Sequence, residues 1–574
     1  MGKKKKVIKE PSKEDHSGIP TLPVWELGFY LLVHVSVVTY ICACVYWASI
    51  EHDGLLNIFD FEDGWKMIGR DKDISNYEWH FFYAYFWRIS PWYVGHMALA
   101  RICDLNFLHY KKPLLTAYSL ASLSFLMGWP VITLFLGHCA LLYTTSLLQS
   151  TSAVWVVSIG LLSTLNFEPF VSWMKALNAN DIEGYKIYLL MFTLALLQLR
   201  YTSFCLEKVK RSNTTQTNKE ERDEVSHISF GYRPLDMLFY VFYFPLFFTG
   251  PIMSFTVFSS QLSQPRKPWT WKRVTSLGTD LCRILLWAFV NELILHYFYF
   301  NALQHNSTIM QEINLWTMAG IGFCSGQFFM TKYTVMFGFP SIVAKTDDLE
   351  PPKGPKCISY IYLYSDMWKY FDRGMYDFMK RYIYVPLGGS RGGITRQFLG
   401  SVLCFSFVYY WHGSEYYAFL WTVFNFIGVT VEAIGAKLMT LQKVKDIQTE
   451  YLSPRGVRRL QALAIVPLYV MSAFTAFCFF GGSLVGYTFY QRFIYNDLFI
   501  ICFDRRTREL GSRFRSVVLL YPGGDGGQEK GTNSSAYKTG LINGIDPLDL
   551  GVTNPFMDIS LRGCQPASGD RNSA

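Results

Sequence analysis

Two side chains that could do chemistry, Asp372 and His412, stand forty positions apart in a largely apolar part of the chain. His412 closes the apolar run 402–411 and is the last of the eleven histidines. An ionisable group at membrane depth is a functional candidate by default, because it needs a partner there. A neutral imidazole can take a proton from an attacking hydroxyl or amine near pH 7. The alternative is a buried core histidine that is bonded to a backbone carbonyl. Considered without its neighbours, His412 fits this alternative better.

Asp372 emerges from an aromatic stretch that includes Trp368. A carboxylate in such surroundings needs a partner. It could orient His412, bind an amine or line a reaction tunnel. Its partner could equally be a neighbouring cation, Lys369 or Arg373. The residues alone leave these alternatives open.

A basic, glycine-rich turn, residues 380–393, lies between the two. Glycines let backbone NH groups approach phosphates, and Arg supplies planar donors. The turn therefore fits the pyrophosphate of an acyl donor such as an acyl-CoA. The alternative is a positively charged cytosolic turn that only sets membrane topology. No Walker pattern or GxGxxG is present, so a nucleotide-hydrolysing site is not supported.

The composition is that of a polytopic membrane protein. Hydrophobic residues make up 51% of the 574 positions and charged residues only 17%, against roughly 25% charged in soluble domains. The net charge of +9 is concentrated in tails and loops, where it sets topology or meets anionic lipid headgroups. A nucleic-acid partner is excluded, because no basic folded domain is visible.

The elements that must position these side chains are expected to be helices. We expect an all-α polytopic protein with about ten spans plus re-entrant pieces. The segment 80–100 contains Arg88, Pro91 and His96, which favours an interfacial or re-entrant piece over a clean span. The other apolar candidates lie at 25–47, 113–129, 131–148, 152–165, 187–206, 235–258, 279–300, 315–340, 396–411, 417–436 and 462–487.

The chain divides into three parts. Residues 1–20 are predicted to be a disordered, basic cytosolic tail, residues 21–503 the transmembrane domain, and residues 504–574 a polar, disordered tail. Within the domain, the basic stretch 437–460 is predicted to be a cytosolic linker or an amphipathic helix. Asn-X-Ser/Thr sequons at Asn213, Asn306 and Asn533 are used only if they are lumenal. The twelve cysteines form no CxxC pair, which indicates neither a zinc ribbon nor a redox motif.

Several motifs in this order resemble the membrane-bound O-acyltransferase family. They are FDRG at 371–374, RYIYVPLGGS at 381–390 and YWHG at 410–413. Further motifs resemble the branch of that family that modifies Hedgehog-type secreted signalling proteins, over roughly residues 21–495. These are LPVWEL at 22–27, YTSF at 201–204, DMWKYFD at 366–372 and GVTVE at 428–432.

The resemblance implies a role for individual residues. His412 matches the family's catalytic histidine and Asp372 its partner acid, both facing a tunnel that crosses the membrane. Trp368 matches a tunnel residue beside the acyl chain. Cys357 stands where the resembled enzymes ligate a haem iron, and a thiolate is a sound axial ligand for haem b. The predicted substrate-binding set is Trp368, Arg381, Tyr384 and Trp411.

The resemblance also implies a reaction. Palmitate would pass from palmitoyl-CoA, entering from the cytosol, to the N-terminal cysteine of a Hedgehog-family precursor in the lumen. The expected location is the membrane of the endoplasmic reticulum or Golgi. Two alternatives stay open: a family member that acylates a lipid or other small alcohol, and a non-catalytic scaffold or transporter. Transporters often show two similar halves, and none are apparent here.

Overall fold

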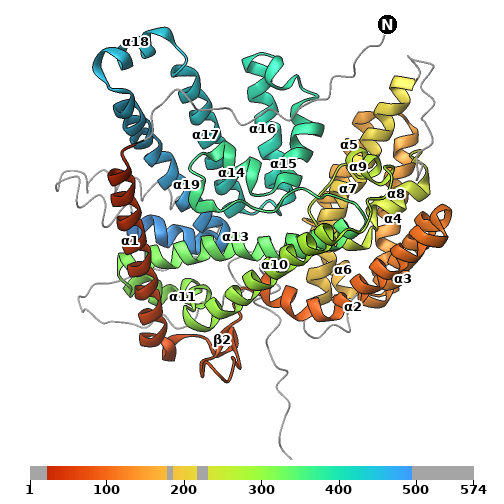
Figure 1. The fold of residues 1–574 in the computed structure, drawn as a ribbon, viewed down its shortest axis with the longest axis horizontal. Coiled ribbons are helices and arrows are strands. Elements are labelled where there is room, and N and C mark those ends of the chain that lie inside the picture. The colour runs from red at the N-terminus through yellow and green to blue at the C-terminus, as the bar shows by residue number, and fades with distance from the viewer. Residues whose placement is uncertain (1–21, 178–184, 216–229, 494–574) are drawn as a thin grey trace, which may run out of the picture.

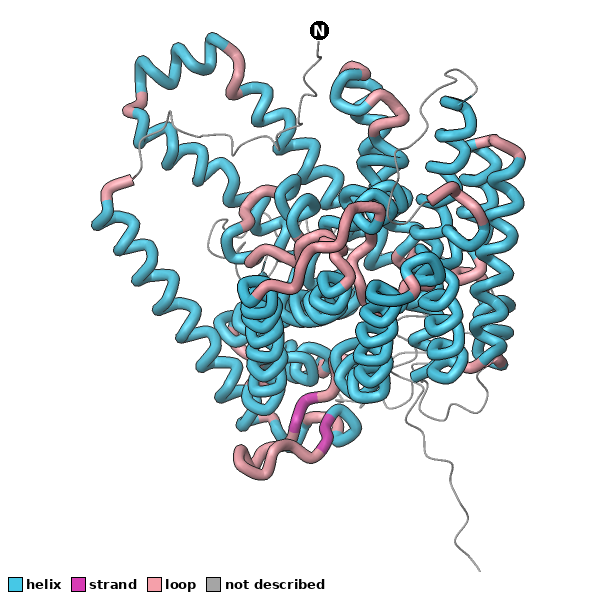
Figure 2. The backbone as a smooth tube through the Cα atoms, turned by 45° about the vertical axis from the view of Figure 1, so that its right-hand side comes forward, coloured by secondary structure: helices cyan, strands magenta, loops and turns pink. Residues whose placement is uncertain are grey.

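The computed structural model describes residues 22–177, 185–215 and 230–493. The two predicted tails, and the end of the predicted transmembrane domain after residue 493, lie outside the described residues. Almost every described element is a helix, and the one small sheet pairs two short antiparallel strands. Figures 1 and 2 show this helical assembly, with the strands at its lower edge. The prediction of an all-α polytopic protein is confirmed.

The helices and strands follow one another as α1 (Val24–Glu51), β1 (Phe61–Glu62), β2 (Lys72–Asp73), α2 (Tyr77–Asn106), α3 (Lys111–Met127), α4 (Trp129–Leu147), α5 (Thr151–Ser163), α6 (Glu168–Ala176), α7 (Tyr185–Thr215), α8 (Pro234–Val241), α9 (Phe255–Leu262), α10 (Trp271–Tyr297), α11 (Phe300–His305), α12 (Ser307–Glu312), α13 (Leu315–Thr346), α14 (Tyr364–Tyr370), α15 (Arg373–Met379), α16 (Ile394–Trp411), α17 (Tyr416–Leu438), α18 (Gln442–Tyr451) and α19 (Pro454–Tyr490).

Five described helices are long and apolar enough to cross a membrane on their own: α1, α4, most of α7, α17 and α19. The pair α5 and α6, bent by 67°, would make a sixth. Of the other stretches that we expected to span, 315–340 lies within the long helix α13 and most of 279–300 lies within the long helix α10, while others fold as shorter or broken pieces. For example, 235–258 divides into α8, a single 3-10 turn and α9, because Pro245 and Pro251 remove backbone donors that one continuous helix would need.

Helix α2 is continuous, although Pro91 lies within it. A proline in a helix leaves the carbonyl four residues earlier, here that of Trp87, without its usual N–H partner. The hydroxyl of Ser90 donates to that carbonyl at 3.3 Å. A side chain therefore replaces the missing backbone bond, and the segment 80–100 does not break.

Helix α13 lies at the centre of the assembly and crosses behind α10 (Figure 1). It contributes to two apolar cores. One is built mainly from α2 to α9 with α15 and part of α16, and the other mainly from α1, α10, α11, α12 and α19 with Trp79 of α2; Phe339 packs against both. Movement of α13 would therefore disturb both cores, since protein interiors are close-packed.

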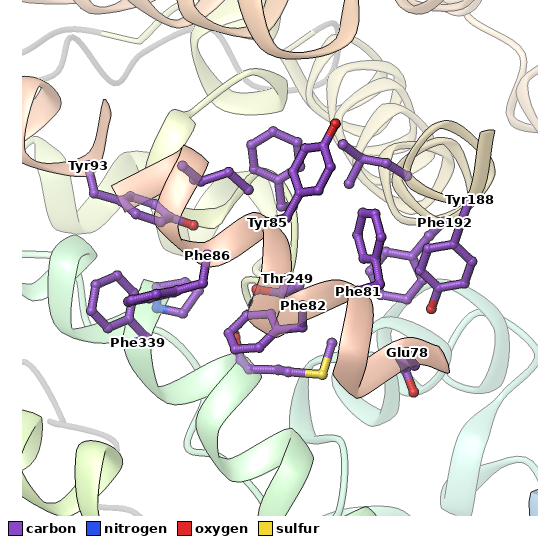
Figure 3. A pocket seen from close by; sticks show the side chains of 15 residues that line it. Glu78, Phe81, Phe82, Tyr85, Phe86, Tyr93, Tyr188, Phe192, Thr249 and Phe339 are labelled. Atoms are coloured by element: carbon purple, nitrogen blue, oxygen red, sulfur yellow. Dashed lines mark hydrogen bonds between the residues drawn. The ribbon is translucent and has the colours of Figure 1, made fainter. Parts of the chain in front are cut away.

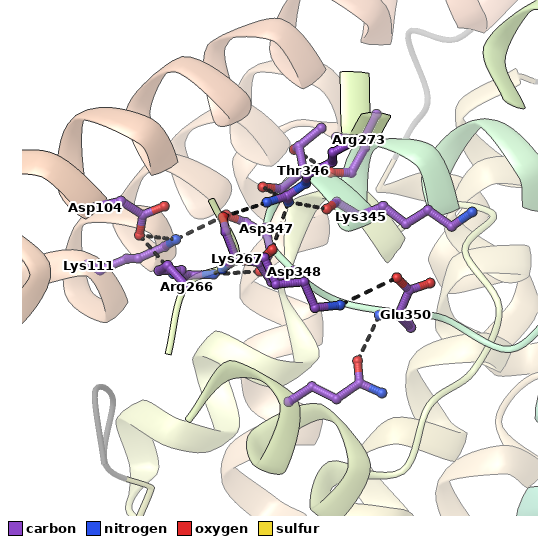
Figure 4. Close-up of polar contacts among 12 residues, drawn as sticks. Asp104, Lys111, Arg266, Lys267, Arg273, Lys345, Thr346, Asp347, Asp348 and Glu350 are labelled. Atoms are coloured by element: carbon purple, nitrogen blue, oxygen red, sulfur yellow. Dashed lines mark hydrogen bonds and ion pairs between the residues drawn. The ribbon is translucent and has the colours of Figure 1, made fainter. Parts of the chain in front are cut away.

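A buried ionic cluster fixes the C-terminal end of α13 (Figure 4). The Asp347 carboxylate accepts from Lys111 Nζ at 3.0 Å, His96 Nε2 lies 3.1 Å from it, and Tyr243 Oη donates to it at 2.7 Å. These partners come from α3, α2 and the segment after α8. The cluster satisfies the buried carboxylate, which would otherwise be costly, and it holds the end of α13 against α2, α3 and the segment after α8.

Candidate functional site

His412 ends α16, where its backbone N–H bonds to the carbonyl of Val408 at 3.0 Å. Its imidazole meets three aromatic rings edge-on, Trp411, Phe479 and Trp421, at centroid distances of 4.7, 5.2 and 5.5 Å. This enclosure lowers the pKa of His412 to about 4, because it removes water from the charged form. Since the pKa lies below cellular pH, the imidazole is neutral there and free to accept a proton.

The turn after His412 is fixed by backbone geometry. Gly413 has φ 103° and Ser414 has φ 61°, a left-handed conformation that glycine adopts without strain. The hydroxyl of Tyr409 donates to the Ser414 carbonyl at 2.6 Å. The order Trp-His-Gly therefore lets the chain reverse at once and start α17, leaving the imidazole between α17 and α19.

Trp368 is held by α17. Its indole N–H donates to Asn425 Oδ1 at 3.1 Å, and the amide of Asn425 donates in turn to the carbonyl of Trp421 at 2.7 Å. The Trp368 ring lies 5.3 Å from Trp421, which also contacts His412. The structure thus brings two predicted site residues, Trp368 and His412, into contact with the same indole, that of Trp421.

Asp372 is the N-cap of α15. Its Oδ1 accepts from the backbone N–H of Met375 at 2.9 Å, which satisfies one of the unpaired donors at the helix start. Burial raises the pKa of the carboxyl above its usual range, and the bond from Met375 partly opposes this. The next residue in the motif, Gly374, has no room for a side chain, since a Cβ there would lie 2.6 Å from the Ile252 carbonyl oxygen.

Among the described residues, no hydrogen bond joins Asp372 to His412, although a chain of ring contacts runs between their neighbourhoods. Phe479, which touches His412, lies 6.1 Å from Phe329 of α13. Phe329 in turn stacks on Phe371, the residue before Asp372, at 5.1 Å and 9° between planes. Three rings, Phe479, Phe329 and Phe371, therefore link His412 to the residue before Asp372, and we call these three rings the aromatic wall.

The basic turn 380–393 has the backbone that its glycines suggest. Gly388, Gly389 and Gly393 all have positive φ, which other residues rarely adopt. Arg381 is partly committed: Nε lies 3.3 Å from Glu207 Oε1 and one terminal nitrogen donates to Ser254 Oγ at 3.0 Å. Its side chain is still 42% exposed, so it can meet an anionic group as well.

Two other predicted substrate-binding residues face different surroundings. Tyr384 packs against the start of α16, where a Cβ at Gly400 would lie 3.0 Å from its ring. Trp411 donates its indole N–H to the carbonyl of Ala195 on α7 at 3.1 Å. Trp411 therefore anchors the end of α16 to the larger core as well as touching His412.

Cys357 lies in the loop between α13 and α14, and its thiol is exposed. The nearby rings of Tyr360 and Tyr362 are 86% and 59% exposed. Among the residues that the structure describes, no group of three or more His, Cys, Asp or Glu could hold a metal ion. In this part of the described chain, the thiol of Cys357 is therefore accessible to a ligand from solvent.

An apolar pocket lies between α2, α7 and α13 (Figure 3). Its lining is aromatic or aliphatic apart from Glu78, Thr249 and the hydroxyls of three tyrosines. Such a lining suits a hydrocarbon chain. The lining residues are Glu78, Phe81, Phe82, Tyr85, Phe86, Ile89, Tyr93, Tyr188, Leu189, Phe192, Phe248, Thr249, Met336, Phe339 and Pro340.

Comparison with known proteins decides the family. The family model of the membrane-bound O-acyltransferases matches residues 120–475. The chain is 32% identical to the protein-cysteine N-palmitoyltransferase HHAT of Mus musculus over 82% of its own length and 93% of that relative. The chain belongs to the membrane-bound O-acyltransferase family.

Two further relatives of this acyltransferase extend the similarity. The protein-cysteine N-palmitoyltransferase Rasp of Drosophila melanogaster is 28% identical over 75% of this chain and 82% of its own. The HHAT-like protein of Mus musculus is 28% identical over 78% and 85%. The resemblance drawn from the motifs is therefore confirmed for the family, and it extends to relatives named protein-cysteine N-palmitoyltransferases.

Several residues of the acyltransferase site were missed in the sequence. Trp421, Phe479 and Phe329 are unremarkable aromatic residues within apolar runs, and no spacing sets them apart. Asn425 did carry a signal, because a polar side chain inside the apolar helix α17 needs a partner. Glu432 of the GVTVE motif pairs with the hydroxyl and the backbone N–H of Ser365, which ties α17 to α14.

Proposed function

We propose that this acyltransferase moves palmitate from palmitoyl-CoA to the N-terminal cysteine of a Hedgehog-type secreted protein. Two of its relatives are named protein-cysteine N-palmitoyltransferases, and the similarity to each covers three quarters or more of this chain. The geometry that carries the proposal is the neutral imidazole of His412, enclosed by aromatic rings one indole away from Trp368.

In the proposed reaction, the thioester carbonyl lies beside His412. The imidazole takes the proton from the attacking amine, whose nitrogen forms the new bond to the carbonyl carbon. The carbon–sulfur bond breaks, and the imidazolium returns the proton to the CoA thiolate. Holding donor and acceptor together supplies proximity. Asp372, at the other end of the aromatic wall, would accept a hydrogen bond from the ammonium group of the incoming peptide or from the peptide residues beside that group.

Palmitoyl-CoA, the acyl donor, would lie along the glycine-rich turn and the apolar pocket. The glycine-rich turn and the exposed part of Arg381 suit the phosphates of CoA. The apolar pocket between α2, α7 and α13 suits the palmitoyl chain, and Glu78 at its edge marks the end nearest Asp372. Trp368, Tyr384 and Trp411 would line the path between the two.

We also propose that Cys357 holds a haem, on the strength of the family resemblance and of its exposed thiol. Bound haem would add an electron-carrying iron to the loop before α14, and no step of acyl transfer depends on it here. Purified protein is expected to show a haem absorbance band that Cys357→Ala removes. The exposed residue Cys282, on α10, serves as the control, since Cys282→Ala should leave the band unchanged.

The proposed location is the endoplasmic reticulum membrane, or the Golgi, with the basic end of the molecule in the cytosol. Glu26 at the start of α1 pairs with Arg459 at 2.6 Å, close to the lysines of α18. Basic segments favour the cytosolic side. The other end of α1 is then lumenal, and there Asn306 donates to the Leu55 carbonyl at 3.0 Å.

The two described sequons should therefore differ in glycosylation. Asn306 is expected to carry a glycan, because it lies at the lumenal end of α1. Asn213 is expected to carry none, since it lies less than two helical turns beyond Glu207, the partner of Arg381 at the cytosolic turn. Peptide N-glycosidase digestion of protein from cultured cells checks this. If Asn213→Gln removes the mobility shift and Asn306→Gln does not, the topology is the reverse of the one proposed.

A direct assay tests the function. Purified protein is given palmitoyl-CoA and either a peptide with an N-terminal cysteine or a set of lipid alcohols. We expect an amide-linked palmitoyl peptide and no acylated lipid. Acylation of a lipid alone would establish the other branch of the family, and no transfer to any acceptor would favour a non-catalytic scaffold.

A further inference from the structure

A buried ion pair lies beneath the aromatic wall and has no part in the proposed reaction. Lys332, on α13, is 3% exposed, and its Nζ lies 2.5 Å from Glu78 Oε2 on α2. The other carboxylate oxygen of Glu78 accepts from Tyr333 Oη at 2.8 Å. Nζ also donates to Asn76 at 3.3 Å. Each carboxylate oxygen of Glu78 thus accepts a hydrogen bond from α13.

The same pair contacts the rings on which both halves of the site rest. Lys332 Nζ lies 5.3 Å from the ring centre of Phe329 and 5.4 Å from that of Tyr333. Phe329 stacks on Phe371 and also meets Phe479. Tyr333 lies 5.9 Å from Phe371. The Lys332 ammonium therefore lies over the ring of Phe329. That ring contacts both Phe371, which precedes Asp372, and Phe479, which contacts His412.

A buried ion pair is weak support for stability, since replacing both partners by apolar groups is often neutral. The position of this ion pair beside the aromatic wall suggests a role other than stability. The pair fixes the rotation of α13 relative to α2, because Lys332 and Tyr333 both reach the single carboxylate of Glu78. It also sets the height of the Phe329 ring through the cation over its face.

We propose that Lys332 and Glu78 are positioning residues for acyl transfer: together they hold Phe329 and Tyr333 so that Asp372 and His412 keep their spacing across the aromatic wall. This inference rests on the proposed function of the site. Neither residue touches the reacting atoms. Glu78 reaches the wall from the edge of the apolar pocket, where Figure 3 shows it apart from the Phe339 end.

The test compares three variants of the full-length protein: Lys332→Met, Lys332→Met with Glu78→Gln, and Lys332→Arg. Lys332→Met leaves a buried charge unpaired and is expected to lower both Tm and kcat. The double variant removes both charges, so Tm should recover while kcat stays between about tenfold and a hundredfold below wild type. Lys332→Arg keeps the pair and should restore most of kcat.

Lys112→Met is the matched control. Lys112 forms an equally short pair with Asp236, at 2.5 Å, between α3 and α8, and neither residue lies in the aromatic wall. Its loss should change Tm without changing kcat per folded molecule. A double variant with wild-type Tm and wild-type kcat would overturn the proposal, and so would an equal fall of kcat in Lys112→Met.

A second readout does not depend on the substrate. Diethyl pyrocarbonate modifies an accessible neutral imidazole, and mass spectrometry follows the rate at His412. A loosened wall should raise that rate several-fold in the double variant and not in Lys112→Met. If the wild type transfers no palmitate, the proposed function fails while this readout still decides the positioning role. An unchanged rate in the double variant would then overturn it.

Discussion

Replacing His412 with Ala is expected to lower the turnover of palmitoyl transfer by about 10²–10⁴-fold, the range that a lost general base commonly produces. The loss should fall on kcat, because the imidazole acts when the amine is deprotonated and adds little to the binding of palmitoyl-CoA. The measurement is the rate of peptide acylation at saturating donor.

His109→Ala is the control for this experiment, because His109 is exposed and lies in a short turn before α3. It should leave both kcat and KM unchanged. His412→Ala with full turnover would remove His412 as the base. An equal loss in His109→Ala would show that the assay reports membrane insertion and not chemistry.

The second large effect is expected at Asp372, where the structure separates two roles. Asp372→Asn keeps a side-chain oxygen that can accept from the Met375 N–H, since Asn is as good an N-cap as Asp. It removes only the negative charge. We expect a fall in kcat of about a hundredfold or more for a residue that acts in the transition state, with Tm little changed.

Asp372→Ala should lose the cap as well as the charge. The lost cap is expected to cost about 0.5–2 kcal/mol of stability, which a lower Tm would record. Asp372→Ser restores the cap without the charge and should recover Tm but not kcat. If Asp372→Asn or Asp372→Ser works as well as wild type, Asp372 is a structural cap and the pairing with His412 is wrong.

Some elements were predictable because they depend on local chemistry. Long apolar runs with few charges predicted a polytopic helical protein, since only helices satisfy every backbone group of a single chain segment within lipid. The basic stretch 437–460 was predicted to be a linker or an amphipathic helix, and it contains α18. The continuity of α2 was not predictable, because it depends on the hydroxyl of Ser90 and not on helix propensity.

By itself, the sequence was sufficient to predict the family, the acyl-transfer chemistry and the two residues most expected to perform it. Those inferences rest on the resemblance carried by the types and order of residues in short motifs, such as FDRG and YWHG. Each motif is local, so it can be read from one continuous stretch of the chain. The tertiary structure alone decided how that pair is arranged. Asp372 caps a helix and His412 closes another, and the aromatic wall that links them combines Phe329 of α13 with Phe479 of α19. Contacts between helices so distant in sequence depend on packing, and any ring of suitable size can fill such a position. No local sequence pattern therefore predicts which rings meet.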